Sequence, residues 1–299
     1  MRRNHKLLVI IFTVTFALSG LTAVGQSQNI APFQKQFISL WDETLTQLVP
    51  VRWGSISPSE VNAMIGAGVP FFLLDVRTTA EFQAERIAGA VNIPIDQLPA
   101  RLHELPADRE TPIVVYCKVG HRGALGFALI RQWGYVNVRG MVGGIDAWKA
   151  ARFPTDTTPV TVTPPQPQTR VLPPCDKQFL TLWDDMLTQV KPVRWGSITI
   201  AETNAMLLGN VPFLALDVRT PAEFATGRIP GAVNIPLDQL PSRLRELPAD
   251  PETIIVVYCK AGHRSVMGFA LLRQFGYVNV TSMVGGMDAW RAAGYPIEQ

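Results

Sequence analysis

The apolar residues near the beginning of the chain's folded part follow the period of a helix. They are spaced four, four and three residues apart, at Phe37, Trp41, Leu45 and Leu48. This spacing predicts a helix with one apolar face, and Pro50 ends it because proline cannot continue a helix. The pattern returns at Phe179, Trp183, Leu187 and Val190 before Pro192. We expect each helix to bury its tryptophan against its own half of the chain instead of stacking it on a cofactor.

Further along, short apolar runs alternate with segments of helical pattern. Ser57 followed by Glu60 is the pattern of a capping box and predicts a helix that begins at Pro58. We expect strands at 71–76, 91–93, 113–116 and 135–138, and helices at 97–105, 122–133 and 145–151. Apolar runs without a polar face are typical of strands that are covered on both sides. The alternation therefore predicts an α/β fold, in which a parallel sheet is flanked by helices on both faces.

The second half of the chain repeats the first half without a gap. Cys117 returns as Cys259 and Trp148 as Trp290, and each pair is separated by 142 positions. The run Pro-Val-Arg-Trp-Gly-Ser-Ile at 50–56 recurs unchanged at 192–198. This unit is far longer than the roughly 20–50 residues of a solenoid repeat. We therefore expect two similar globular domains, at 33–154 and 175–299.

The composition agrees with two folded domains and argues against nucleic-acid binding, a disulfide scaffold and a metal site. The chain has 299 residues, of which 47% are hydrophobic and 17% charged, so bulk disorder is excluded. There are 27 basic and 24 acidic residues, and three of the basic ones lie in the first six positions, so the body is balanced in charge. Nucleic acid is therefore not an expected partner. Three cysteines and four unclustered histidines predict neither a disulfide scaffold nor a metal site.

The first 25 residues have the pattern of an export signal. Basic residues precede an apolar run from Leu7 to about Val24, and small residues occupy Ala23 and Gly25. We expect cleavage after Gly25, which would leave a periplasmic or secreted protein without a membrane contact. The apolar run is close to the roughly 18 residues that begin to span a bilayer. A membrane anchor formed by an uncleaved N-terminal segment is therefore the alternative.

Residues 155–174 differ from both repeated units. They are rich in proline and threonine and have no apolar periodicity, which predicts an extended, semi-rigid linker. Cys175 directly follows this linker and has Phe33 as its counterpart in the first half. Because this cysteine is not repeated, we expect it to have no function. A mixed disulfide with an exported protein partner is the alternative.

We expect the chemistry at two matching loops, each of which joins a buried strand to a helix. They are Cys117-Lys118-Val119-Gly120-His121-Arg122 and Cys259-Lys260-Ala261-Gly262-His263-Arg264. Free N–H groups at a helix start, the helix dipole and basic side chains all favour an anion. Such surroundings can lower the pKa of a cysteine to about 3.5–7.5. We therefore predict that Cys117 and Cys259 are the nucleophiles, at the sheet edge where ligands bind.

The residues that follow each cysteine are expected to bind an anionic substrate. They are Lys118, Gly120, His121 and Arg122 in the first half, and Lys260, Gly262, His263 and Arg264 in the second. The glycine lets the loop curl so that N–H groups converge, and the arginine can bind an oxyanion with two N–H groups. The histidine is a candidate proton donor or substrate contact.

Supporting roles are expected at the end of a neighbouring strand. Asp75 is expected to anchor backbone groups, and the four-residue spacing of Arg77 and Glu81 predicts an ion pair. The second half has the same residues, at Asp217, Arg219 and Glu223.

Further stretches recur in the same order in both halves. In the first half they are Leu-Asp-Val-Arg at 74–77, Arg-Ile-Ala-Gly-Ala-Val-Asn-Ile-Pro at 86–94, the cysteine loop, and Gly-Tyr-Val-Asn-Val at 134–138, which leads to Gly143-Gly144 and Trp148. Together they resemble the rhodanese (thiosulfate sulfurtransferase) family over nearly all of both halves. The resemblance implies a tandem of two rhodanese-like α/β domains.

The resemblance also implies a mechanism of sulfur transfer. Cys117 or Cys259 as a thiolate attacks the outer sulfur of thiosulfate or a similar anionic donor, and a thiophilic acceptor later collects that sulfur from a cysteine persulfide. This chemistry requires no cofactor. Familiar two-domain members keep the cysteine only in the second domain, whereas both copies keep it here. Serine often follows the loop arginine in the family, as Ser265 does, so we expect the first domain, with Gly123, to be slower.

Two other functions are open on the sequence alone. Phosphatases and arsenate reductases of related folds carry one more residue between cysteine and arginine, and we expect the shorter loop of this chain to be too tight for phosphate. The second alternative is not an enzyme but an extracytoplasmic binding module. Its cysteines would carry sulfur or sense thiols with little turnover, so turnover with small acceptors distinguishes it from an enzyme.

Overall fold

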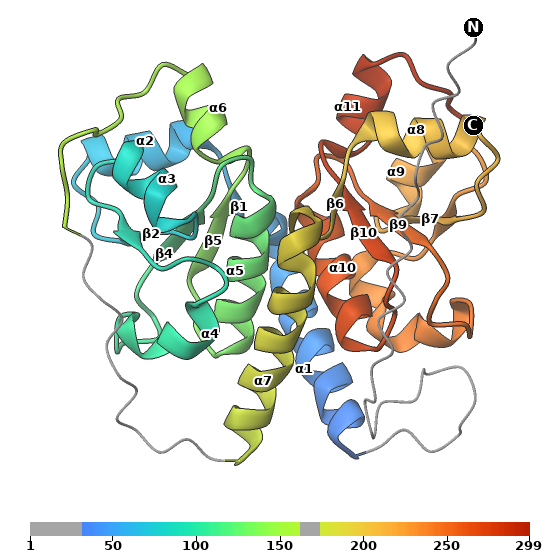
Figure 1. Cartoon of the computed structure of the whole chain (residues 1–299), viewed down its shortest axis with the longest axis horizontal. Coiled ribbons are helices and arrows are strands. Elements are labelled where there is room, and N and C mark those ends of the chain that lie inside the picture. Colours follow the sequence, from blue (N-terminus) through green and yellow to red (C-terminus); the bar gives the residue numbers. More distant parts are fainter. Residues whose placement is uncertain (1–31, 162–173) are drawn as a thin grey trace, which may run out of the picture.

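The computed structural model describes residues 32–161 and 174–299, which form two five-stranded parallel sheets (Figure 1). The first sheet has the order β1-β5-β4-β2-β3 and the second the order β6-β10-β9-β7-β8. The strands of the first are β1 (Ser55–Ile56), β2 (Phe72–Asp75), β3 (Val91–Asn92), β4 (Ile113–Tyr116) and β5 (Val138–Met141). Those of the second are β6 (Ser197–Ile198), β7 (Leu214–Asp217), β8 (Val233–Asn234), β9 (Ile255–Tyr258) and β10 (Val280–Met283). The predicted fold class is confirmed.

Helices cover both faces of each sheet. The first half contains α1 (Pro32–Leu48), η1 (Val49–Gly54), α2 (Pro58–Gly66), α3 (Thr79–Ala84), α4 (Leu98–Arg101), η2 (Leu102–Glu104), α5 (His121–Gln132) and α6 (Gly144–Ala150). The second contains α7 (Pro174–Val190), η3 (Lys191–Gly196), α8 (Ile200–Leu208), α9 (Pro221–Ala225), η4 (Leu237–Gln239), η5 (Pro241–Glu246), α10 (His263–Gln274) and α11 (Gly286–Ala292). The predicted capping box is present, because the Ser57 hydroxyl accepts from the Glu60 N–H and the Glu60 carboxylate accepts from the Ser57 N–H.

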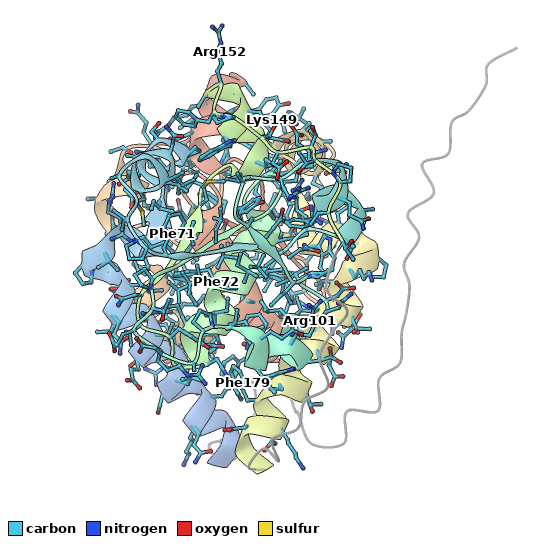
Figure 2. The ribbon with its side chains drawn as sticks, turned by 90° about the vertical axis from the view of Figure 1, so that its left-hand side faces the viewer. Phe71, Phe72, Arg101, Lys149, Arg152 and Phe179 are labelled. Atoms are coloured by element: carbon cyan, nitrogen blue, oxygen red, sulfur yellow. The ribbon has the colours of Figure 1, made fainter. Side chains whose placement is uncertain are left out.

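The buried apolar residues form one core that both domains share and a smaller core on the outer face of each sheet. Val115 of β4 belongs to the shared core, whereas its neighbour Val114 belongs to the outer core of the first domain. Phe72 likewise packs against the shared core and Phe71 against the outer core, and both are labelled in Figure 2. Successive side chains of a strand point to opposite faces, which explains why these strands are apolar throughout.

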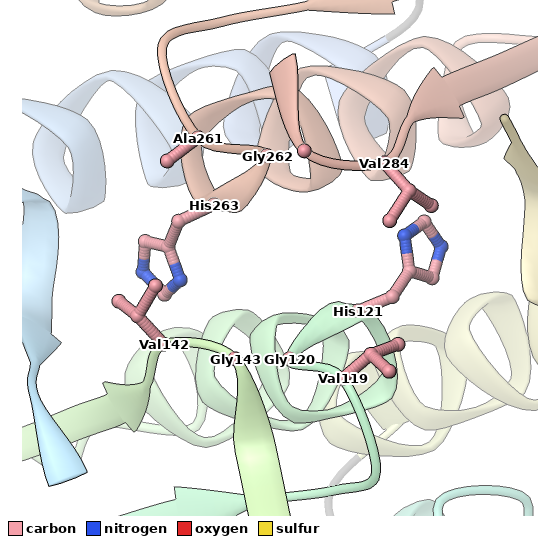
Figure 3. Close-up of a pocket in the computed structure, with 10 residues that line it drawn as sticks. Val119, Gly120, His121, Val142, Gly143, Ala261, Gly262, His263 and Val284 are labelled. Atoms are coloured by element: carbon pink, nitrogen blue, oxygen red, sulfur yellow. The ribbon is translucent and has the colours of Figure 1, made fainter. Parts of the chain in front are cut away.

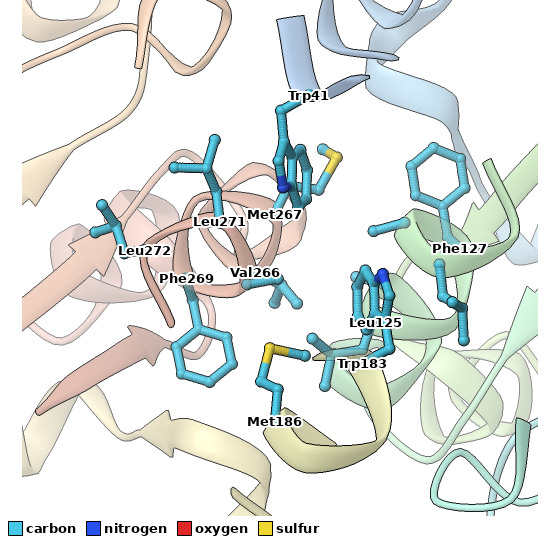
Figure 4. Close-up of a cluster of buried hydrophobic side chains, with 14 of the residues drawn as sticks. Trp41, Leu125, Phe127, Trp183, Met186, Val266, Met267, Phe269, Leu271 and Leu272 are labelled. Carbon is cyan, nitrogen blue, oxygen red and sulfur yellow. The ribbon is translucent and has the colours of Figure 1, made fainter. Parts of the chain in front are cut away.

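Helices α1 and α7 are exchanged between the domains. Trp41 of α1 is fully buried, and its indole N–H donates to Oε1 of Gln274 in α10 at 2.9 Å. Trp183 of α7 donates in the same way to Gln132 of α5 at 3.0 Å. In Figure 4 both tryptophans lie in the shared core among side chains of α5 and α10. The expectation that each helix packs its tryptophan on its own half is therefore wrong.

The similarity of the two halves makes this exchange possible. Both domains offer the same buried glutamine as an acceptor for an indole N–H, which must find a partner once it leaves water. Either domain therefore offers an acceptor to either helix, and in the structure each helix uses the acceptor of the other domain. The end of α1 stays with its own domain, where Gln47 accepts a hydrogen bond from Arg131 at 2.7 Å.

The last strand of each sheet begins later than its apolar pattern predicts. We expected a strand at 135–138, but β5 spans Val138–Met141. The Tyr135 N–H bonds to the carbonyl of Ile130 at the end of α5, and its hydroxyl donates to the carbonyl of Pro106. These bonds fix Tyr135 in the turn that ends the helix, so pairing with β4 starts only afterwards.

Several expectations concern residues outside the described ranges. The export signal at 1–25 and most of the linker lie there, and the side chain of Cys175 is not described. The first linker residues are described and lie against the first domain, where Arg86 and Asp156 exchange two backbone hydrogen bonds. Within 32–161 and 174–299, no helix has the length and apolarity that crossing a membrane requires.

Candidate active site

Each predicted nucleophile lies at the carboxyl end of a central strand. Cys117 opens the loop between β4 and α5, and Cys259 opens the loop between β9 and α10. Both cysteines are buried, with 1% of their surface exposed, and both are free thiols. Lys118 and Lys260, the next residues, are exposed to solvent. The fold thus places a buried sulfur and an exposed positive charge at the edge of each sheet.

The loop curls back over the sulfur that begins it. Gly120 has a φ of +98° and Gly262 a φ of +101°, a conformation that favours glycine. As a result, the Gly120 N–H donates to Sγ of Cys117 at 3.2 Å and the Gly262 N–H to Sγ of Cys259 at 3.1 Å. The N–H groups of Val119 and Gly123 also act on the Cys117 sulfur. Such a cradle of N–H groups stabilises an anion at the start of a helix.

Burial opposes this stabilisation at Cys117. Loss of water raises the pKa of the thiol, whereas the Arg122 charge and the loop N–H groups lower it without offsetting the burial. The expected lowering of the Cys117 pKa is therefore wrong. The sequence reveals the groups that favour a thiolate, but it does not reveal how completely the sulfur is withdrawn from water.

The loop arginines are paired with glutamates from a neighbouring helix. Two hydrogen bonds of 2.7 Å join Arg122 to Glu81 of α3, and Arg264 meets Glu223 of α9 at 2.7 and 2.6 Å. Burial raises the pKa of Glu81, but bonds from Arg122 and Thr78 outweigh it and hold the value at about 2. Each arginine thus has a fixed direction beside the cysteine loop.

The predicted pairing of Arg77 with Glu81 is wrong. The Arg77 side chain bonds to Asp75, whose Oδ2 accepts from Nη2 at 2.6 Å and whose Oδ1 accepts from Nε at 3.0 Å. Asp75 also accepts from the backbone N–H of Arg77 at 2.9 Å, so it anchors a backbone group as expected. Asp217 and Arg219 repeat the arrangement. These buried pairs stabilise the end of the strand next to the one that leads to each cysteine.

His121 and His263 are directed toward the other domain. Nε2 of His121 lies 2.8 Å from the carbonyl oxygen of Trp195, and Nε2 of His263 lies 3.0 Å from that of Trp53. A carbonyl only accepts, so Nε2 carries the proton in both rings. Burial lowers the pKa of each histidine to about 4, although the carbonyl partly opposes this. Both rings are therefore neutral at pH 7 and are held as part of the domain boundary.

The two cysteine loops face each other across a small cavity (Figure 3). It is lined by 119–121 and 142–143 of the first domain and by the matching residues of the second. Its volume is about 30 Å³, where one water needs about 10–15 Å³. His121 lines this cavity, and its Nδ1 has no hydrogen-bond partner among the described residues.

The two sites differ in one polar network. Ser282 donates to Oγ of Ser265 at 2.9 Å, Ser265 donates to the carbonyl of Gly262 at 2.9 Å, and Sγ of Cys259 lies 3.7 Å from Oγ of Ser265. The first domain has Gly123 at the position of Ser265, so its sulfur has no such hydroxyl. Within the described ranges, no group of three or more His, Cys, Asp or Glu residues is placed to hold a metal ion.

Sequence reasoning missed two contributors to these sites. The spacing along the chain pairs Glu81 with Arg77, whereas the structure pairs it with Arg122, and no local pattern predicts the roles of the Trp53 and Trp195 carbonyl groups. The unchanged recurrence of 50–56 at 192–198 was the available signal for the tryptophans. No comparable signal distinguishes the two arginines as partners of Glu81.

Comparison with known proteins matches the rhodanese-like domain to residues 57–151 and 199–293. A sulfurtransferase of Allochromatium vinosum is 44% identical over 84 residues, which cover 28% of this chain and 77% of that protein. Thiosulfate sulfurtransferase 16, chloroplastic, of Arabidopsis thaliana is 32% identical over 111 residues, which cover 34% of this chain and 91% of that one. The crystal structure of a thiosulfate sulfurtransferase from Pseudomonas aeruginosa is 16% identical, with a TM-score of 0.34 over 87% of this chain and 69% of that chain. Both matched ranges contain a cysteine loop.

Proposed function

The chain belongs to the rhodanese-like domain family, and from this premise we propose that it moves sulfane sulfur from thiosulfate or a similar anionic donor to a thiophilic acceptor. Two relatives described as sulfurtransferases support this class of reaction. One observation assigns the reaction to particular residues: loop N–H groups converge on the sulfur of Cys117 and on the sulfur of Cys259. The same groups that favour a thiolate would favour a persulfide anion, because both place negative charge on sulfur at that point.

The proposed reaction has two steps in which atoms and electrons balance. In the first, the thiolate of Cys117 or Cys259 attacks the outer sulfur of thiosulfate. A sulfur–sulfur bond forms to the cysteine, the bond to the sulfonate group breaks, and sulfite leaves with its electron pair. In the second, an acceptor such as cyanide attacks the terminal sulfur of the cysteine persulfide. Thiocyanate forms, and the thiolate is regenerated.

The positive charges around each loop have separate tasks in this proposal. Lys118 and Lys260 are exposed and attract the anionic donor from solvent. Arg122 and Arg264 are held by Glu81 and Glu223, so their direction is set before the donor arrives. A pre-set guanidinium stabilises charge without reorganising at the moment of reaction.

A sulfur carrier or thiol sensor with little turnover is the second candidate. The burial of Cys117 and the raised pKa of its thiol favour it, because little thiolate is then present at neutral pH. Such a protein would be loaded once and would pass its sulfur to an exported protein partner. The export signal expected at 1–25 would place either function outside the cytoplasm.

The test is the intact mass of the mature chain before and after thiosulfate, with Cys117→Ser and Cys259→Ser as matched variants. We expect a gain of one sulfur atom for each intact loop, reversed by cyanide with release of thiocyanate. Repeated cycles with small acceptors support the enzyme, and a single load supports the carrier. The double variant is the control for sulfur bound elsewhere. Absence of loading at both cysteines contradicts the proposal.

A further inference from the structure

A strained turn precedes the first strand of each domain, and the proposed function does not use it. Arg52 and Trp53 have φ values of +53° and +59°, and Arg194 and Trp195 have values of +56° and +62°. Left-handed backbone is uncommon for residues other than glycine and stores strain, which clusters at functional positions. The seven residues 50–56 are nevertheless identical to 192–198. Strain that both copies retain indicates a function for this turn.

Each turn is held in place by its own domain. The Arg52 guanidinium is paired with Glu60 at 2.5 Å, and the Ser55 hydroxyl donates to the Arg52 carbonyl at 2.8 Å. Gly54 lies so close to Phe127 that a Cβ there would come within 2.4 Å of the ring. A strained backbone persists only where its surroundings over-determine it, and these contacts supply that condition.

The tryptophan of each turn contacts the cysteine loop of the other domain. The Trp53 carbonyl accepts the hydrogen bond from His263 at 3.0 Å, and the Trp195 carbonyl accepts from His121 at 2.8 Å. The guanidinium carbon of Arg264 lies 5.9 Å from the centre of the Trp53 ring, within the range of a cation–π contact. Trp53 thus contacts two successive residues of the Cys259 loop.

The same boundary is closely packed around His263. Its ring centre lies 5.3 Å from that of Phe127, the ring against which Gly54 packs. It also lies against Gly140 of β5, where a Cβ would come within 2.7 Å of the imidazole. The contacts from the strained turn to the opposite loop are therefore continuous, and the glycine leaves room for them.

We propose that Trp53 and Trp195 are positioning residues that act across the domain boundary, so that Trp53 holds the Cys259 loop and Trp195 holds the Cys117 loop. His263 and Arg264 are the first two residues of α10, directly after the curve that brings the Gly262 N–H to the sulfur. Holding them fixes that N–H and the guanidinium relative to Cys259. The inference rests on the proposed function only in that this geometry serves sulfur transfer.

The test measures the rate at which iodoacetamide alkylates each cysteine at one fixed pH in the full chain, with each peptide followed by mass spectrometry. In Trp53→Ala the ring beside Arg264 is lost, whereas the bonds from Arg264 to Glu223 remain. We expect the alkylation rate of Cys259 to fall by roughly threefold to tenfold, because the start of α10 is held less firmly beside the sulfur. The alkylation rate of Cys117 stays unchanged.

Two further variants separate positioning from general damage. Trp53→Phe keeps a ring beside Arg264 and should restore most of the alkylation rate of Cys259. Val51→Ala changes a side chain of the same turn that is 51% exposed, and it should leave both alkylation rates unchanged. Trp53→Leu keeps an apolar side chain if the alanine variant fails to fold. The inference is overturned if a folded Trp53 variant without the ring alters both cysteines equally, or neither.

Alkylation requires no sulfur donor, so the two proposals fail separately. A crossed pattern without sulfur loading at either cysteine leaves this inference standing and removes the proposed function. If both cysteines take up sulfur but Trp53→Ala changes alkylation of Cys117 instead of Cys259, the proposed function stands and this inference is removed.

Discussion

The indole N–H of Trp41 donates its hydrogen bond to Gln274, a residue of the other domain that lies 233 positions away in the chain. The reciprocal bond from Trp183 to Gln132 makes the exchange of α1 and α7 mutual. Each domain therefore completes its inner face with a helix from the other half. The shared core joins the two sheets into one packed unit.

This exchange predicts that the two domains unfold together. Loss of either domain removes the surface on which the other half's helix packs, so neither is expected to survive alone. We expect a single calorimetric transition whose van't Hoff and calorimetric enthalpies agree. Two resolved transitions would contradict the prediction.

Gln274→Leu is expected to destabilise the chain by about 1–3 kcal/mol, because it leaves the buried indole N–H of Trp41 without an acceptor. Urea unfolding measures the loss. Gln132→Leu is the matched change on the other side and should cost a similar amount. In a Trp41→Phe background the Gln274→Leu change should cost less, and an undiminished cost would argue against the bond as the cause.

Stability is expected to fall as the pH falls from about 6.5 to about 4. His121 and His263 have pKa values of about 4 in the fold, and about 6.5 when unfolded, so the unfolded chain binds these protons first. Their contribution is complete above pH 6.5 and is lost as the pH falls through 4, at most about 3 kcal/mol for each ring. Denaturant titrations between pH 7.5 and 5 measure the slope. A double variant with His121→Phe and His263→Phe should show a smaller slope of stability against pH. An equal slope would show that the histidines do not cause the pH dependence.

Glu81→Gln is expected to lower the free energy of unfolding by about 1–3 kcal/mol, because the partly buried Arg122 loses its charged partner. It should also weaken sulfur loading at Cys117 and leave Cys259 unaffected, because Glu81 no longer fixes the orientation of the Arg122 guanidinium beside the Cys117 loop. Glu223→Gln is the matched variant with the opposite selectivity. Chemical denaturation and loading of each cysteine by peptide mass report the two effects, and equal effects on both cysteines would contradict a local role.

Sulfur loading of Cys117 is expected to accelerate with rising pH. Burial raises the pKa of this thiol, so the thiolate fraction grows up to tenfold per unit below that pKa. In the Cys259→Ser variant, the initial rate of loading between pH 6 and 9 reports Cys117 alone. A flat profile would show that deprotonation does not limit this site.

Local patterns predicted most of the elements, but not the two-residue strand β1 or the six-residue helix α3, which are too short to show a period. The apolar run at 113–116 and the glycine three residues after Cys117 were sufficient to place the nucleophile at a strand end before a helix. The spacing of Arg77 and Glu81 misled, because α3 begins at Thr79 and Arg77 precedes its cap, so the two residues share no helical face. Burial of Cys117 and of the loop histidines depends on distant residues and has no local pattern.

The sequence by itself determined the repeat, most of the strands and helices, and the position of each cysteine, because these depend on periodicity and turn chemistry within a few residues. Only the tertiary structure decided which half receives each tryptophan, which carboxylate holds each loop arginine, and which carbonyl holds each loop histidine. The tryptophan and histidine contacts cross the domain boundary, where two similar halves offer the same partners, so no pattern along the chain distinguishes a contact within a domain from one across the boundary. The arginine contact lies within a domain, but it joins residues 41 positions apart that meet only once the domain has folded.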